Sequence, residues 1–311
     1  MSDVIYTVSI YEENSPKFIR YSLPSILNHA NQVGADWKLI STTEAIDPKL
    51  PFAQSILDYC KDNPGHAHFY KLYALIDFVF SQHSRMMLVD DDILIKHNAI
   101  NLFRRHEAGT LMISEHETSD GYPQLHPTST YPLLLTVMDS NGGVHHTETR
   151  TETANERGDI RNVVKRIPEL SEEAEGHLLE NFKTEINSGL YVIDKLAANR
   201  LVAKFANDFH DGINMDQGYV LGKIGEAKIP CKNIPDRAHI NPLNYESEVI
   251  KSTETTEELL EAIKEPCREH YESSFFHFNG EKNRKEYMEE FFLANKSLFF
   301  TPVFHVGTMD K

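Results

Sequence analysis

The chain has 311 residues, of which 40% are hydrophobic and 25% charged, a composition that argues against disorder, collagen and coiled coil. Its 47 acidic residues outnumber its 31 lysines and arginines, which gives a formal net charge of −16. Such a surface repels phosphate backbones, so we expect no general binding to nucleic acid or to anionic membranes. An acidic chain that handles phosphate needs a local device, most simply a divalent cation held by carboxylates.

The three cysteines are widely separated and form neither a disulfide framework nor a CxxC metal site. The first residues lack the basic and apolar regions of a secretory signal. No stretch approaches the roughly 20 apolar residues that cross a bilayer. These patterns predict a cytoplasmic protein without a membrane span.

Strands and helices are predicted to alternate along the first third of the chain. A strand at 4–10 leads into a helix that starts at Ser15-Pro16, where proline suits the first helical position. Periodicity then predicts a strand at 37–40, helices at 52–59 and 69–80, and strands at 85–89 and 110–114.

The segment 115–185 carries little sustained periodicity, and we interpret it as an insertion. Beyond it the sequence predicts a strand at 186–193, helices at 195–209 and 215–224, a helix at 257–264, a strand at 274–278 and a helix at 284–294. Alternating strands and helices favour one α/β domain over residues 1–311, with a mostly parallel central sheet flanked by helices.

The strongest single feature is the triplet Asp90-Asp91-Asp92, directly after the apolar run 86–89. Alternate residues of an extended segment point the same way, so we expect Asp90 and Asp92 to converge while Asp91 faces elsewhere. Two carboxylates suit Mn²⁺ or Mg²⁺, and ligands of open α/β sheets gather at the carboxyl ends of strands. A solvated acidic loop is the alternative interpretation.

Other polar residues interrupt apolar segments further along the chain. His277 lies on an aromatic strand, and imidazole can complete a metal site begun by carboxylates, although a buried structural histidine is the commoner case. Asn187-Ser188-Gly189 precedes a strand and Asp216-Gln217-Gly218 opens a helix. Each of these is a turn or cap in isolation, but amide and carboxylate groups also suit sugar hydroxyls.

Taken in order, these segments resemble glycosyltransferase family 8, the retaining transferases of the GT-A fold that include glycogenin and bacterial lipopolysaccharide galactosyltransferases. The resemblance rests on four motifs: the DxD of Asp90 to Asp92, the corner Ile186 to Gly189, the DQ of Asp216-Gln217, and the HxxG of His277 to Gly280. It implies a hexosyltransferase that uses a UDP-sugar and a divalent metal, with glucose or galactose as the usual sugar and a carbohydrate or glycoconjugate as acceptor.

The resemblance also implies a role for each matching residue. Asp90, Asp92 and His277 would bind Mn²⁺ or Mg²⁺, and Asn187, Asp216 and Gln217 would line the sugar. The remaining donor contacts would come from Ile10, Glu12, Asn14, Lys71, Asp91, Ser188, Gly280 and Lys282.

The chain departs from the family pattern at two places. The family's HxxGxxKPW has no Pro-Trp here, and Lys282 comes one residue early, which leaves Lys285 as the other candidate for the diphosphate. The interval between the DxD and Asn187 is longer than in the family, which is why 115–185 is interpreted as an insertion.

Two other functions fit parts of the pattern. A haloacid-dehalogenase-type phosphatase also places a DxD after an apolar strand, but Leu94 stands where that class usually has Thr or Val. A module that binds sugar nucleotides without turnover would keep the same motifs.

Overall fold

A computed structural model describes residues 2–11, 16–115, 130–138, 144–153, 159–207, 209, 216–235, 239–240, 274–278 and 287–299. The elements up to the insertion are β1 (Asp3–Val8), α1 (Ile19–Val33), β2 (Asp36–Ile40), α2 (Ala53–Asp62), α3 (Tyr70–Phe80), β3 (Arg85–Val89), β4 (Ile93–Ile95) and β5 (Leu111–Glu115), with short 3₁₀ turns at Thr43–Ala45, Pro64–Phe69 and Leu102–Arg104. After the insertion come β8 (Ile186–Asp194), α7 (Lys195–Val202), α8 (Asp216–Ala227), β9 (Cys231–Asn233), β10 (His239–Ile240), β11 (Phe275–His277), α11 (Tyr287–Ala294) and α12 (Lys296–Phe299).

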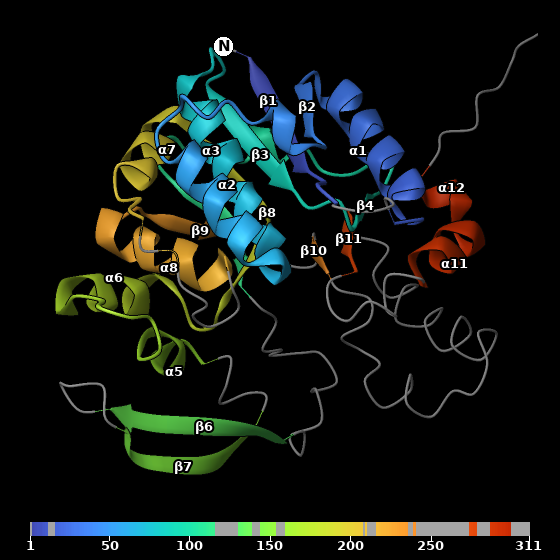
Figure 1. The fold of residues 1–311 in the computed structure, drawn as a ribbon. Coiled ribbons are helices and arrows are strands. Elements are labelled where there is room, and N and C mark those ends of the chain that lie inside the picture. Colours follow the sequence, from blue (N-terminus) through green and yellow to red (C-terminus); the bar gives the residue numbers. More distant parts are fainter. Residues whose placement is uncertain are drawn as a thin grey trace, which may run out of the picture.

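The central sheet has six strands in the order β2-β1-β3-β8-β5-β9 (Figure 1). β8 runs antiparallel to β3 and β5, and the other neighbouring pairs are parallel. Crossovers through helices explain this arrangement, because parallel neighbours cannot be joined by a tight hairpin. The predicted α/β class with a mostly parallel sheet is confirmed.

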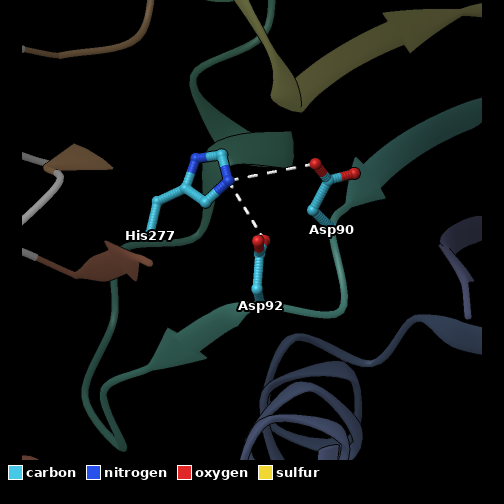
Figure 2. Close-up of side chains that lie close together, drawn as sticks. All are labelled: Asp90, Asp92 and His277. Atoms are coloured by element: carbon cyan, nitrogen blue, oxygen red, sulfur yellow. Dashed lines mark ion pairs between the residues drawn. The ribbon is translucent and has the colours of Figure 1, made fainter. Parts of the chain in front are cut away.

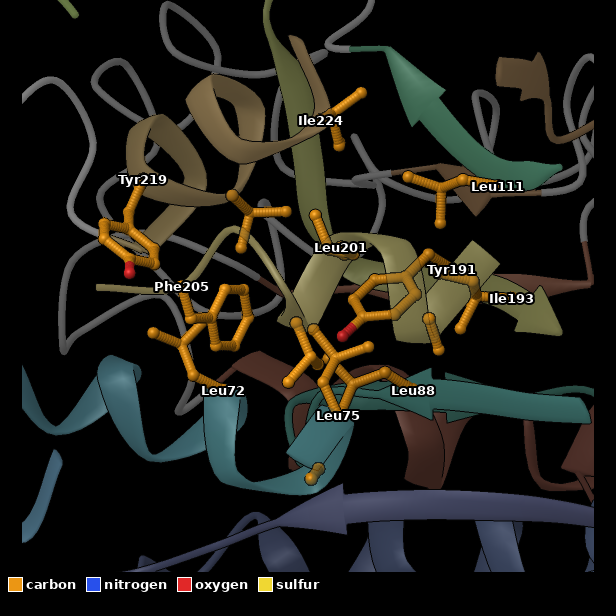
Figure 3. Packing of buried hydrophobic residues seen from close by; sticks show 14 of the residues in the cluster. Leu72, Leu75, Leu88, Leu111, Tyr191, Ile193, Leu201, Phe205, Tyr219 and Ile224 are labelled. Carbon is orange, nitrogen blue, oxygen red and sulfur yellow. The ribbon is translucent and has the colours of Figure 1, made fainter. Parts of the chain in front are cut away.

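Alternating residues of the central strands face two apolar layers. Leu88 and Tyr191 belong to a large cluster with residues of α2, α3, α7 and α8, and part of this cluster is drawn in Figure 3. Met87 and Val192 point to the opposite layer, where α1 contributes Ile26. Burial on both faces explains why these strands are almost continuously apolar in sequence. The sheet is therefore a rigid platform whose strand ends carry the polar residues.

A smaller sheet, β10-β11-β4, continues from the end of β3. Its Leu94 and Phe276 pack with aromatic residues of the C-terminal helices, among them Phe291 and Phe299, and with Phe18 before α1. This aromatic cluster attaches the C-terminal helices to the short strand that follows the acidic triplet.

The segment 115–185 holds regular structure where it is described. It contains the antiparallel hairpin β6 (Thr130–Met138) and β7 (Val144–Thr153), followed by α5 (Ile160–Val164) and α6 (Glu172–Asn181). Helix α6 contacts α8, and its Leu178 belongs to the large cluster. That this segment is an insertion into one domain stays a prediction.

Several element boundaries differ from the sequence prediction, among them the start of α1 and the end of α7. α1 begins at Ile19 instead of at Ser15-Pro16, because Ile19 and Arg20 still bond to residues three positions back, as in a 3₁₀ turn. α7 ends at Val202, and the non-helical Phe205 packs against Tyr219 in the core instead of extending the helix. The predicted helix at 257–264 lies outside the described residues.

Among the helices that the structure describes, none is long and apolar enough to cross a bilayer.

His29 on α1 is a buried histidine with a pH consequence. Its ring is 1% exposed and packs edge-on against Phe275, and in the described part of the chain neither ring nitrogen has a hydrogen-bond partner. Burial lowers the pKa of His29 to about 4. His29 is therefore protonated below about pH 6.5 in the unfolded chain but only below about pH 4 in the folded chain. The free energy of unfolding consequently falls as the pH drops from 6.5 towards 4.

We expect His29→Leu to remove this part of the acid sensitivity. By pH 5 the wild type should have lost about 2 kcal/mol through His29. Urea unfolding of both proteins at pH 7 and pH 5 measures it. An equal loss in wild type and variant would contradict the expectation.

Candidate functional site

Asp90, Asp92 and His277 form a cluster at the end of β3 (Figure 2). Their ligand atoms all lie within 4.8 Å of one another. Nε2 of His277 is 3.1 Å from Oδ1 of Asp92 and 3.9 Å from Oδ2 of Asp90. The three predicted metal ligands are thus brought together from two distant parts of the sequence.

The backbone explains how this cluster forms. The amide of Ile93 donates to the carbonyl of Asp90 at 3.2 Å, so the triplet is a tight turn that carries the chain from β3 to β4. β4 then pairs with β11 in a register that sets His277 opposite Ile93, and Phe278 N donates to Asp92 O at 3.0 Å. Asp90 and Asp92 do meet, but on a turn and not on the extended segment that was predicted.

The donor set fits a small divalent cation. Carboxylate oxygens are the preferred ligands of Mg²⁺ and Mn²⁺, and one imidazole is compatible with the latter. The side chains of Asp92 and His277 are 6% and 3% exposed, whereas that of Asp90 is 20% exposed. Such cations take more than three ligands, so a substrate could supply further oxygens.

Gly189 on β8 leaves the space that the cluster occupies. Its carbonyl accepts from Asp90 N at 2.8 Å, which continues the pairing of β3 with β8. A Cβ on Gly189 would overlap Cε1 of His277 and lie 2.9 Å from Oδ2 of Asp90. The φ angle of Gly189 is not positive, so glycine is required here for space and not for an unusual backbone conformation.

Lys71 on α3 connects the cluster to α8. Its ammonium lies 3.0 Å from Oδ2 of Asp90 and 3.3 Å from Oδ2 of Asp216. Burial alone would lower the pKa of Lys71, but the charges of Asp216 and Asp90 raise it above the ordinary value. The lysine stays charged and compensates two carboxylates that belong to different elements.

Ser188 links the same aspartate to the next residue of α8. Its hydroxyl donates to Oδ2 of Asp216 at 2.8 Å, and its backbone amide donates to Oε1 of Gln217 at 3.2 Å. Asn187 accepts from Gly189 N at 2.9 Å. Ser188 therefore joins Asp216 and Gln217 to β8, whereas the bond of Asn187 to Gly189 stays within β8.

Asn187, Ser188 and Gly189 lie inside β8, whereas the sequence predicted a polar corner that precedes the strand. On β5, Ile113 pairs with Tyr191 and the next residue, Ser114, pairs with Asn187. The β8 residues between Asn187 and Tyr191 therefore have no partner on β5. The irregularity frees Ser188 and Gly189 from the β5 ladder, while Asn187 still pairs with Ser114 and Leu190 still pairs with β3. Periodicity in the sequence does not reveal a bulge of this kind.

Asp91 is not part of the cluster of Asp90, Asp92 and His277, and its contact with Tyr11 was missed by the sequence analysis. The hydroxyl of Tyr11 donates to Oδ2 of Asp91 at 2.6 Å. Burial, together with the charge of Asp91, raises the pKa of Tyr11, so the phenol stays a donor. The only sequence signal for this contact was the position of Tyr11 beside the predicted donor residue Ile10.

The remaining predicted donor residues divide into two groups. Ile10 is half-buried and packs against the large apolar cluster. Four others, and the alternative lysine, lie outside the described residues: Glu12, Asn14, Gly280, Lys282 and Lys285.

The sequence matches no protein-family model and no curated protein. Solved structures do match. A glycosyltransferase involved in glycosylation of the major capsid of PBCV-1 aligns with 93% of this chain and 100% of its own, at 11% identity and a TM-score of 0.43. The galactosyltransferase LgtC, in complex with donor and acceptor sugar analogs, aligns with 97% of this chain and 98% of its own, at 12% identity and a TM-score of 0.44.

A third match is the bifunctional enzyme WbbM, aligned with 97% of this chain and 50% of its own, at 10% identity and a TM-score of 0.45. These neighbours are glycosyltransferases.

Proposed function

We propose that this chain is a retaining, divalent-metal-dependent glycosyltransferase of family 8 with a GT-A fold. It would transfer a hexose, glucose or galactose, from a UDP-sugar to a carbohydrate or glycoconjugate acceptor. The observation that carries the proposal is the cluster of Asp90, Asp92 and His277 at the carboxyl end of β3, in a mostly parallel sheet. Nucleotide ligands of such sheets bind at strand ends.

Each part of the site has a task in this proposal. A bound Mn²⁺ or Mg²⁺ would neutralise negative charge on the diphosphate. Asp90, Asp92 and His277 would hold that ion, and Lys71 would add a fixed positive charge nearby. Asn187, Asp216 and Gln217 would bind the sugar, while Ile10 and Asp91 would lie near the nucleoside. Glu12, Asn14, Gly280 and Lys282 remain predicted donor contacts.

Retention of configuration requires attack on the face from which the nucleoside diphosphate departs. An enzyme nucleophile would have to stand on the other face, and Gln217, the candidate there, carries an amide, which is a poor nucleophile. We therefore favour a front-side route in which the leaving phosphate accepts the proton of the acceptor. Product stereochemistry from a donor of known configuration tests this, and an inverted product would contradict the family assignment.

A panel of UDP-sugars tests the main proposal without knowledge of the acceptor. We expect Mn²⁺-dependent hydrolysis of UDP-glucose or UDP-galactose, lost when EDTA removes the metal and regained with excess Mn²⁺. Hydrolysis of phosphomonoesters instead would indicate the phosphatase. Binding without turnover in the presence of candidate acceptors would indicate the binding module, and activity that survives EDTA would contradict the metal site.

A further inference from the structure

Ser188 is too deeply buried to serve as a donor contact itself. Its residue is 2% exposed, and it lies in the irregular part of β8 between the metal cluster and α8. Its two hydrogen-bond donors are both used within the protein, the hydroxyl on Asp216 and the backbone amide on Gln217. Ser188 therefore contacts both members of the DQ pair at the same time.

The contact with Asp216 determines which of its two carboxylate oxygens remains available to accept a hydrogen bond from a ligand. Ser188 Oγ and Lys71 Nζ both reach Oδ2 of Asp216, at 2.8 and 3.3 Å. Within the described part of the chain, no hydrogen bond or ion pair reaches Oδ1. A carboxylate whose one oxygen is held by two donors keeps a fixed orientation, and its second oxygen stays an acceptor.

The contact with Gln217 decides the orientation of its amide. A backbone N–H only donates, so the Gln217 atom that faces Ser188 must be the oxygen, and Nε2 must be the other end. Among the described residues, no group accepts from Nε2. Gln217 therefore keeps an amide N–H donor, and the preceding residue, Asp216, keeps a carboxylate acceptor. Both residues lie at the start of α8.

We propose that Ser188 is a positioning residue that sets Asp216 and Gln217 to bind a hydroxyl group of the donor hexose. A hydroxyl both donates and accepts, so it matches a carboxylate oxygen and an amide N–H together. This inference rests on the proposed function and names its sugar as a neutral hexose with a free hydroxyl at this position. It also revises the predicted role of Ser188, which acts through its neighbours.

Ser188→Ala removes the bond to Asp216 and keeps the backbone bond to Gln217. With Mn²⁺ and the preferred UDP-hexose, we expect kcat/KM for donor hydrolysis to fall roughly 10- to 100-fold, mainly through KM. The Kd of UDP with Mn²⁺ should stay within about twofold, because UDP lacks the hexose that would contact Asp216. Ser25→Ala is a matched control, since Ser25 is 1% exposed and its hydroxyl bonds Ser22 O and Ile95 N.

A double-mutant cycle shows whether Ser188 acts through Asp216. Asp216→Ala should lower kcat/KM further than Ser188→Ala, and the double variant should equal Asp216→Ala within about twofold. Effects that multiply would overturn the proposal. So would a Ser188→Ala enzyme with wild-type kcat/KM, or one that loses UDP affinity in parallel with sugar affinity.

Gln217→Glu serves if Ser188→Ala does not fold. It keeps an oxygen for the amide of Ser188 but replaces the amide donor by an acceptor, so KM for the UDP-hexose should rise while the Kd of UDP does not. An unchanged KM would overturn the proposal. Wild-type protein that neither binds nor hydrolyses UDP-sugars would contradict the proposed function itself, whereas an active wild type with a normal Ser188→Ala variant would contradict this inference alone.

Discussion

Asp92→Asn should abolish metal binding and, with it, turnover of the UDP-sugar. Asp92 is buried, its Oδ1 lies 3.1 Å from Nε2 of His277, and it is one of the three candidate ligands. Exchange for an amide removes the negative charge without changing the size of the side chain. Loss of a partner outside the ligand set costs roughly 10- to 100-fold in metal affinity, and loss of a ligand should cost at least about 100-fold. Calorimetric titration with Mn²⁺ measures it.

Asp91→Asn is the matched control for this experiment. It makes the same chemical change on the same turn, but Asp91 is bonded to Tyr11 and lies outside the metal cluster. Its Mn²⁺ affinity should stay within a few-fold of wild type. Equal losses in the two variants would show that general charge, and not a defined ligand set, attracts the cation.

Gly189→Ala should have an effect of similar size through a different cause. The added methyl group would overlap the ring of His277 and crowd Asp90, so His277 must move out of the cluster. We expect loss of Mn²⁺ binding and of donor hydrolysis, together with a lower Tm, because the backbone of Gly189 is bonded to Asp90 and cannot retreat. Thermal unfolding and Mn²⁺ titration check both effects.

Gly176→Ala separates this steric effect from the general effect of replacing glycine. Gly176 lies in α6, and a Cβ there meets nothing within 4 Å. Alanine in a helix interior stabilises by roughly 0.5–1 kcal/mol relative to glycine. A Gly189→Ala protein that behaves like Gly176→Ala would contradict the packing of His277 over β8.

The general fold was predictable because its signals are local. Buried strands such as 85–89 are short apolar runs, and α3 shows its helical spacing directly in the sequence. The proximity of Asp90 and Asp92 was also predicted, but from an extended segment, whereas the structure brings them together on a tight turn. His277 was identified through the family motif, since one histidine among phenylalanines carries little information.

Contacts that depend on pairing across the fold were not predictable. The bond between Tyr11 and Asp91 needs the loop after β1 to meet the turn after β3, and no periodicity encodes that. The link from Lys71 to Asp216 depends on how α3 and α8 approach the sheet. The bulge in β8 follows from its register with β5, which a single strand sequence does not specify.

The short sheet formed by β4 and β11 has a consequence for biosynthesis. More than half of the chain separates Asp92 from His277, and the pairing of β11 with β4 brings them together. A growing chain therefore exposes the acidic turn long before its histidine has been synthesised, and contacts of such long range form late. Until then Asp90 and Asp92 lack His277, the third proposed ligand. The proposed cation site can therefore be completed only after β11 has been synthesised.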